Sequence, residues 1–150
     1  MADIHFYHLT ATPLDRALPK LLEKALQGGY RILIRAGSQD KAEALNALLW
    51  MYDPASFLPH GTTGDGRSGQ QPVFIAGNKE NPNQATLLLV ADGSEMEPGE
   101  AFARVLDVFD GNREDELASA RARWKRYRET GHVVSYVRQN ERGGWEKQDA

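Results

Sequence analysis

Hydrophobic residues recur along this chain with two different periods. Some segments are short, nearly continuous apolar runs, which predict strands that are covered on both faces. Others carry leucine and alanine at every third or fourth position, which predicts helices with one buried face. The expected strands are 4–9, 30–34, 73–76, 86–90 and 132–137, and the expected helices are 13–27, 39–52, 101–109 and 113–128.

Capping residues support several of these boundaries. Thr12 with Pro13 suits the start of the first helix, Ser38 the start of the second, and Asn112 the start of the last. Strands that alternate with helices imply right-handed crossovers and a mainly parallel sheet. We therefore expect an α/β fold of three layers, a twisted and mainly parallel sheet with helices on both faces, similar to a Rossmann fold.

Composition limits the number of domains and the class of protein. The 150 residues are 41% hydrophobic and 26% charged, as expected of one globular domain. We assign residues 1–138 to a single α/β domain and expect 139–150 to form a loose polar tail. No secretory signal or membrane span is expected. The absence of cysteine excludes disulfides and thiolate chemistry and fits a reducing cytoplasm.

Two groups of residues resemble catalytic motifs. The loop 61–69 matches G-x-G-x-x-G and, with Arg67 in place of lysine, a phosphate-binding loop. Both motifs require a helix directly afterwards, whereas Pro72 and a predicted strand follow here. His5 and His8 are three residues apart on a strand and point to opposite faces. We therefore predict no catalytic, cofactor-binding or metal-binding residues, and a chain that is not itself an enzyme.

A basic and aromatic helix is the most distinctive segment. Residues 121–128 hold five of the 18 basic side chains. On a helix, Arg121, Lys125 and Arg128 fall within about 60° of one another, with Trp124 beside them. One interpretation is a solvated helix whose apolar stripe is simply core. The other is a cationic rim with an aromatic wall, suited to an acidic peptide end or to phosphates.

An aromatic and proline-containing segment, residues 48–60, spans the end of the second predicted helix. It contains Trp50, Phe57, Pro59 and His60. Such a cluster usually belongs to the core and its loops. Large aromatic side chains in a proline-rich connection can also remain partly exposed and anchor a partner protein.

These segments, taken in order, resemble one family. They occur in the same order and without large gaps between about residues 3 and 137. Over this range the chain is similar to the chi subunit of bacterial DNA polymerase III holoenzyme. The motifs that carry the resemblance are Phe6-Tyr7, Ala47-Leu48-Leu49-Trp50, Ser56-Phe57-Leu58-Pro59-His60, the Gly64/Gly66 loop before Pro72-Val73, and Arg121-x-Arg123-Trp124-Lys125-x-Tyr127-Arg128 before Gly131.

The resemblance implies a replication adaptor in the bacterial cytoplasm that contacts nucleic acid only indirectly. One implied partner is the acidic tail of single-stranded-DNA-binding protein, which ends in Pro-Phe, and the other is the psi subunit of the polymerase. The residues implied for the tail are Arg121, Trp124, Lys125 and Arg128. The residues implied for psi are Trp50, Phe57, Pro59 and His60.

Two other functions remain as alternatives. The helix 113–128 could bind nucleic acid directly, with Trp124 and Tyr127 stacking on bases. The net charge of −3 and the short extent of the basic patch argue against this alternative. The second alternative is a nucleotide-dependent enzyme that uses loop 61–69. The absence of a predicted helix directly after that loop argues against this alternative.

Overall fold

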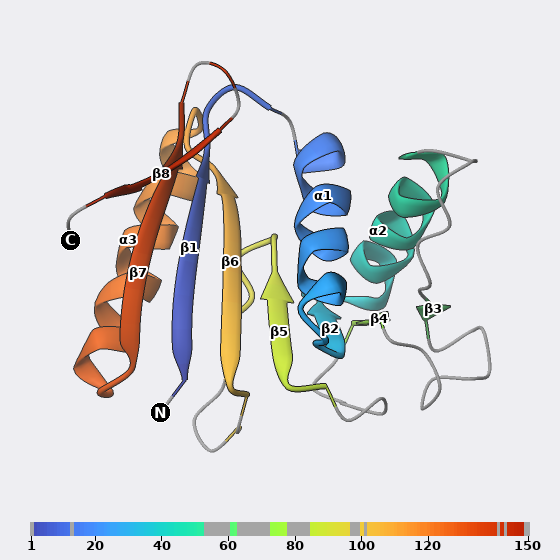
Figure 1. Ribbon diagram of the computed structural model, residues 1–150, viewed down its shortest axis with the longest axis horizontal. Coiled ribbons are helices and arrows are strands. Elements are labelled where there is room, and N and C mark those ends of the chain that lie inside the picture. Colours follow the sequence, from blue (N-terminus) through green and yellow to red (C-terminus); the bar gives the residue numbers. More distant parts are fainter. Residues whose placement is uncertain are drawn as a thin grey trace.

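The computed structural model describes residues 2–12, 14–52, 61–62, 73–77, 85–96, 100, 102–140, 142 and 144–148. Within these ranges, strands and helices alternate in the first third of the chain and again around the last helix, whereas strands follow one another between these parts (Figure 1). The strands are β1 (Asp3–Leu9), β2 (Ile32–Arg35), β3 (Gly61–Thr62), β4 (Val73–Ala76), β5 (Leu87–Val90), β6 (Arg104–Asp110), β7 (Val133–Gln139) and β8 (Trp145–Gln148). The helices are α1 (Leu14–Gln27), α2 (Gln39–Tyr52) and α3 (Glu114–Glu129).

All the strands of the described ranges belong to one sheet. Their order is β3-β4-β2-β5-β6-β1-β7-β8, and every neighbouring pair is parallel except β7 and β8. β1 and β6 lie near the middle and pair along their whole length, from Asp3 opposite Arg104 to Leu9 opposite Asp110. The mainly parallel α/β sheet expected from the sequence is confirmed.

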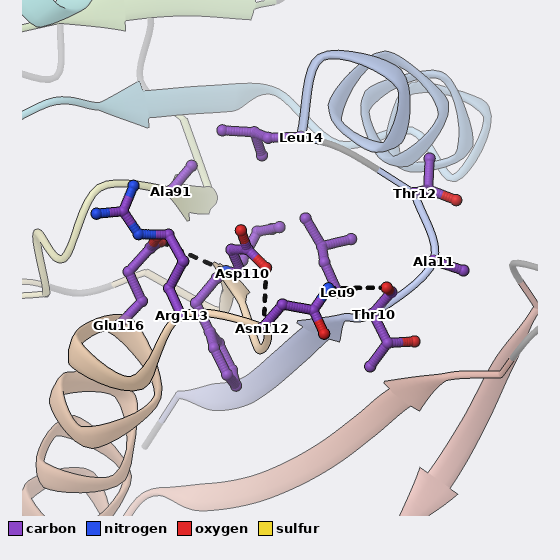
Figure 2. Close-up of a pocket in the computed structure, with 12 residues that line it drawn as sticks. Leu9, Thr10, Ala11, Thr12, Leu14, Ala91, Asp110, Asn112, Arg113 and Glu116 are labelled. Atoms are coloured by element: carbon purple, nitrogen blue, oxygen red, sulfur yellow. Dashed lines mark hydrogen bonds and ion pairs between the residues drawn. The ribbon is translucent and has the colours of Figure 1, made fainter.

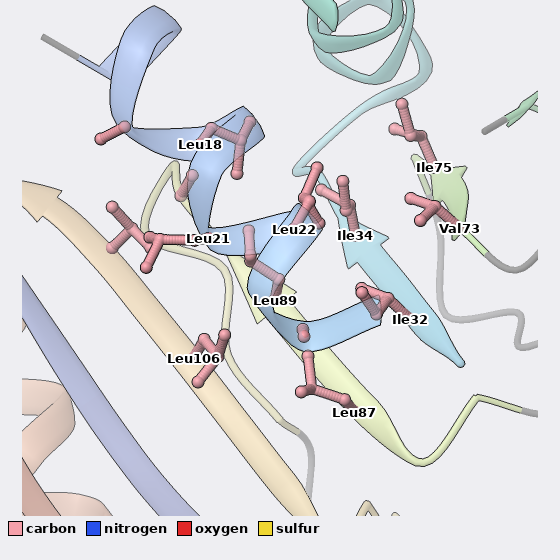
Figure 3. Packing of buried hydrophobic residues seen from close by; sticks show 14 of the residues in the cluster. Leu18, Leu21, Leu22, Ile32, Ile34, Val73, Ile75, Leu87, Leu89 and Leu106 are labelled. Atoms are coloured by element: carbon pink, nitrogen blue, oxygen red, sulfur yellow. The ribbon is translucent and has the colours of Figure 1, made fainter. Parts of the chain in front are cut away.

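The helices cover opposite faces of this sheet. Leu18, Leu21 and Leu22 of α1 pack over Ile32 and Leu87 on one face (Figure 3), and α2 adds partly buried leucines to the same cluster. Ala120 and Tyr127 of α3 belong to a separate cluster on the other face. The three-layer arrangement follows from these two cores. No helix in the described ranges is long and apolar enough to cross a membrane.

The residue that caps α2 is the one predicted from the sequence, whereas the residue that caps α3 is not. The Ser38 hydroxyl accepts a hydrogen bond from the backbone N–H of Lys41 at 3.2 Å, which confirms the predicted start of α2. At α3 the N-cap is Arg113, not Asn112, and it makes no side-chain capping hydrogen bond. The Asn112 side chain instead donates to the carbonyl of Thr10 at 2.8 Å and so joins two loops.

The predicted helix at 101–109 is wrong. This segment contributes β6, in which Val105, Leu106, Val108 and Phe109 are buried. Val105 and Phe109 face the α3 side while Leu106 and Val108 face the α1 side. A central parallel strand is apolar on both faces, and its pattern is hard to distinguish from that of a buried helix.

Strand β8 lies within the segment expected to be a loose tail. It pairs antiparallel with β7, and the Trp145 ring packs edge-on against Tyr7 with 5.0 Å between centroids. The side-chain oxygen of Asn140 accepts hydrogen bonds from the backbone N–H groups of Arg142 and Gly144 and forms the turn between the strands. Residues 145–148 therefore extend the sheet instead.

Candidate partner-binding surface on α3

The inner side of α3 is anchored in the core. Ala120, Arg123 and Tyr127 are its buried residues. The Tyr127 hydroxyl accepts a hydrogen bond from the backbone N–H of Met96 at 2.8 Å, and burial raises the pKa of this tyrosine. Because Tyr127 is only 4% exposed, it has no free face on which a base could stack, which corrects that part of the nucleic-acid alternative.

A buried ion pair joins α3 to β6. The Arg123 guanidinium donates to both carboxylate oxygens of Asp107, at 2.7 and 2.9 Å, and to the Ser119 hydroxyl at 2.6 Å. Burial raises the pKa of Asp107 to about 6, although Arg123 lowers it, so the carboxylate is mostly ionised at neutral pH. The pair fixes how α3 is rotated about its axis over the sheet.

The outer side of α3 carries the cations singled out by the sequence. Arg121, Lys125 and Arg128 are exposed, and none of the three makes an ion pair with a carboxylate of the described residues. Trp124 is half-buried against the core, and the Arg128 guanidinium lies 4.8 Å from the centre of its ring. The structure thus brings all four predicted residues onto one side of the helix, at the border between core and solvent. We call these four the α3 surface.

The remaining basic residues of this helix segment are already engaged. Arg123 is neutralised by Asp107, and Arg126 pairs with Glu95 at 3.1 Å. In the sequence, both arginines belong to the basic segment but not to the four residues predicted to bind the tail. The spacing of Arg123 agrees with its burial, because it shares the inward stripe of Ala120 and Tyr127.

Arg121 of the α3 surface affects the pKa of a buried histidine on β1. His8 is 6% exposed, and its Nδ1 forms a hydrogen bond with the Tyr136 hydroxyl. Burial lowers the pKa of His8, and the positive charges of Arg138 and Arg121 lower it further, while Asp110 acts in the opposite direction. His8 therefore reports on the charge at one end of the α3 surface.

The aromatic segment predicted for psi lies largely outside the described residues. Trp50 is part of α2, while its side chain and the residues Phe57, Pro59 and His60 are not described. Of loop 61–69, only Gly61–Thr62 is described, as strand β3. These assignments stay predictions.

A pocket of about 350 Å³ opens at the carboxyl ends of β1 and β6 (Figure 2). The chain leaves β1 for α1 on one face and β6 for α3 on the other, and open α/β sheets commonly hold ligands at such a point. Here Asp110 and Glu116 contribute carboxylates, and Glu116 pairs with Arg113 at 3.4 Å. The lining thus holds two carboxylates against one arginine, and this excess of negative charge disfavours an anionic phosphate. Among the described residues, no group of three metal-ligating side chains occurs.

Comparisons with known proteins agree with the resemblance noted in the sequence. Residues 1–135 match the family model described as DNA polymerase III chi subunit, HolC. DNA polymerase III subunit chi of Escherichia coli K12 is 34% identical over 120 residues, which cover 79% of this chain and 80% of that protein. The protein of the same name from Haemophilus influenzae is 27% identical over 135 residues, covering 87% and 92% of the two chains.

A third relative is matched over a smaller share of its length. The probable DNA polymerase III subunit chi of Rickettsia prowazekii is 28% identical over 108 residues, which are 72% of this chain and 62% of that protein. The aligned segment thus spans less than two thirds of the Rickettsia protein. Since the family model covers nearly all of the present chain, the chain belongs to the chi-subunit family of DNA polymerase III.

Proposed function

We propose that this protein is a non-catalytic replication adaptor. It would link the clamp loader, through psi, to the acidic C-terminal tail of single-stranded-DNA-binding protein. Membership of the chi family supports a role in replication. The observation that carries the tail assignment is the α3 surface, in which three cations without carboxylate partners among the described residues lie beside a half-buried tryptophan, with Arg128 over its ring.

The chemistry of this surface matches an acidic peptide that ends in an aromatic residue. Arg121, Lys125 and Arg128 offer charge-assisted hydrogen bonds to side-chain carboxylates and to a terminal carboxylate. Trp124 offers an apolar wall for the phenylalanine ring. Because the three cations form no ion pair with the described carboxylates, binding the peptide does not require breaking such a pair first.

The experiment that tests the tail assignment changes Arg121. A hydrogen bond between charged groups contributes about 1.5–3 kcal/mol, so Arg121→Ala should weaken binding of a free acidic Pro-Phe peptide by about ten- to hundredfold. Isothermal titration calorimetry measures the affinity, and thermal denaturation should show an unchanged melting temperature because Arg121 is exposed. Binding should also weaken as salt rises.

The matched control is Arg16→Ala, which removes an exposed arginine from α1 on the other face. This variant should bind the peptide as the native protein does. Equal affinities for native protein and Arg121→Ala would contradict the tail assignment. Stronger binding of an oligothymidine than of the peptide would favour the nucleic-acid alternative.

The psi assignment has a separate test. If Phe57 is an exposed anchor, Phe57→Ala should abolish co-purification with psi while the domain remains folded. If Phe57 belongs to the core, the same change should lower stability by about 3–5 kcal/mol. Co-purification and thermal denaturation of one variant distinguish these outcomes.

A further inference from the structure

A second cationic and aromatic site lies on the sheet face opposite α3. Lys20 and Lys24 are exposed one turn apart on α1, and the half-buried Trp145 of β8 faces them across a cavity of about 150 Å³. Ala17 and Leu21 of α1, both buried, supply apolar lining to this cavity. We call this site the α1–β8 pocket.

Hydrogen bonds hold one wall of this pocket in place. The side-chain oxygen of Gln139 accepts from the backbone N–H groups of Thr10, Ala11 and Thr12 at 3.2, 2.9 and 2.8 Å. Its amide nitrogen donates to the Thr12 hydroxyl at 2.7 Å. Gln139 is only 5% exposed, and it ties the end of β7 to the segment that leads into α1. The pocket therefore requires little ordering before a ligand binds.

The opposite wall is held by aromatic packing. Trp145 meets Tyr7 of β1 edge-on, and both rings pack against the core beneath α1. The turn formed by Asn140 keeps β8 paired with β7. Trp145 lies beyond residue 135, where the match to the chi family model ends.

The charges of the pocket indicate the kind of ligand. Neither Lys20 nor Lys24 makes an ion pair within the described part of the chain, so both ammonium groups are available to an anion. The pocket volume of about 150 Å³ is enough for a benzene-sized group, and Ala17, Leu21 and Trp145 supply the apolar part of its lining. A ligand that combines carboxylates with one apolar side chain satisfies both features.

We propose that the α1–β8 pocket binds an acidic peptide segment of a partner protein. One apolar side chain of the segment fills the cavity against Trp145 and Leu21, and its flanking carboxylates meet Lys20 and Lys24. Nucleic acid fits this site less well, because strand binding uses a continuous basic track and several stacking rings, whereas two cations border a single cavity here. This site is separate from the α3 surface, since α1 and α3 lie on opposite faces of the sheet.

The test uses nuclear magnetic resonance on the whole chain labelled with nitrogen-15. The probe is a C-terminally amidated peptide with one phenylalanine between aspartates and glutamates. We expect it to shift the indole resonance of Trp145 and the amide resonances of Lys20 and Lys24. The double variant Lys20→Ala/Lys24→Ala should bind the probe at least about tenfold more weakly, since two charge-assisted contacts are lost. The control Lys41→Ala/Arg126→Ala removes the same charge outside both proposed binding sites and should retain the Trp145 shift.

Several results would overturn the proposal. They are no shift of the Trp145 indole at saturating probe, equal affinity of the Lys20→Ala/Lys24→Ala variant, or equal binding of a probe with alanine in place of phenylalanine. Displacement of the probe by oligothymidine at lower concentration would identify a nucleic-acid site instead. The indole of Trp124 follows the α3 surface in the same spectra, so the free Pro-Phe peptide tests the proposed function independently.

Discussion

The inner and outer sides of α3 use the same kind of residue in opposite ways. Arg123 is 2% exposed and is held by Asp107 of β6, whereas Arg121, only two positions away, is exposed and has no carboxylate partner among the described residues. Both are arginines in one basic segment. The difference teaches that the number of cations on a helix does not give the size of a binding surface. Only those cations that the rest of the fold leaves unpaired are available to a ligand.

The largest effect is expected on the inner side. Arg123→Ala leaves Asp107 buried without its partner, and removing one member of a buried pair lowers stability by about 3–5 kcal/mol. Urea denaturation followed by circular dichroism measures the free energy of unfolding. Arg121→Ala should change the same quantity by less than about 0.5 kcal/mol, because it removes an exposed side chain.

A double variant separates charge from packing on this inner side. Replacing both partners by apolar residues of similar length, as in Asp107→Leu/Arg123→Met, should recover most of the lost stability, since no buried charge remains unpaired. If Arg123→Ala and Arg121→Ala had equal effects on unfolding, the contrast between the two sides of α3 would be disproved.

A smaller effect should distinguish two arginines on the outer side. Arg128 lies over the Trp124 ring, whereas Arg126 pairs with Glu95. Arg128→Ala should lower the affinity for the acidic Pro-Phe peptide by about tenfold, equivalent to about 1.4 kcal/mol of binding free energy. Arg126→Ala should leave the affinity within about twofold, because Glu95 already engages its charge.

Calorimetric titration of both variants measures these affinities. The two changes remove the same residue type from the same turn, so each is the control for the other. Equal weakening by both would mean that the peptide responds to the total charge of α3, and that the pairing of Arg126 has no consequence for binding.

The sequence predicted the α3 surface but not the pairing beneath it. The angle between Arg121, Lys125 and Arg128 follows from helix geometry alone and is therefore visible in the sequence. The pairing of Arg126 depends on Glu95, 31 positions earlier in the chain, which local periodicity cannot show. Arg123 was more accessible to prediction, because it occupies a position on the apolar stripe of the helix.

Two errors in the fold have a related origin. The sequence predicted a helix at 101–109, whereas Asp107 in this segment belongs to a buried strand and pairs with Arg123, 16 positions later. Strand β8 contains one aromatic residue, Trp145, in a polar segment, and one residue sets no period. Its structure comes from pairing with β7 and from contact with Tyr7, both of which depend on residues distant in sequence.

The smallest expected effect is the change in the pKa of His8 when the charge of Arg121 is removed. Burial lowers the pKa of His8, and Arg138 and Arg121 lower it further. Arg121→Ala removes one of these charges, so the pKa of His8 should rise toward its ordinary value. Lys125→Ala removes an equal charge from the next turn and should leave that pKa unchanged. Titration of the His8 ring resonances by nuclear magnetic resonance measures both variants.

The same shift has a defined sign for stability. The pKa of His8 in the folded protein lies below the unfolded value of 6.5, so the unfolded chain binds this proton more tightly. The stabilising contribution is therefore complete above pH 6.5 and is lost as the pH falls through the folded pKa. Arg121→Ala should reduce this loss, because it brings the folded and unfolded pKa values closer. An identical pH dependence of unfolding in native protein and Arg121→Ala would contradict this prediction. It would mean that the charge of Arg121 on the surface of α3 has no effect on the pKa of His8 in the sheet.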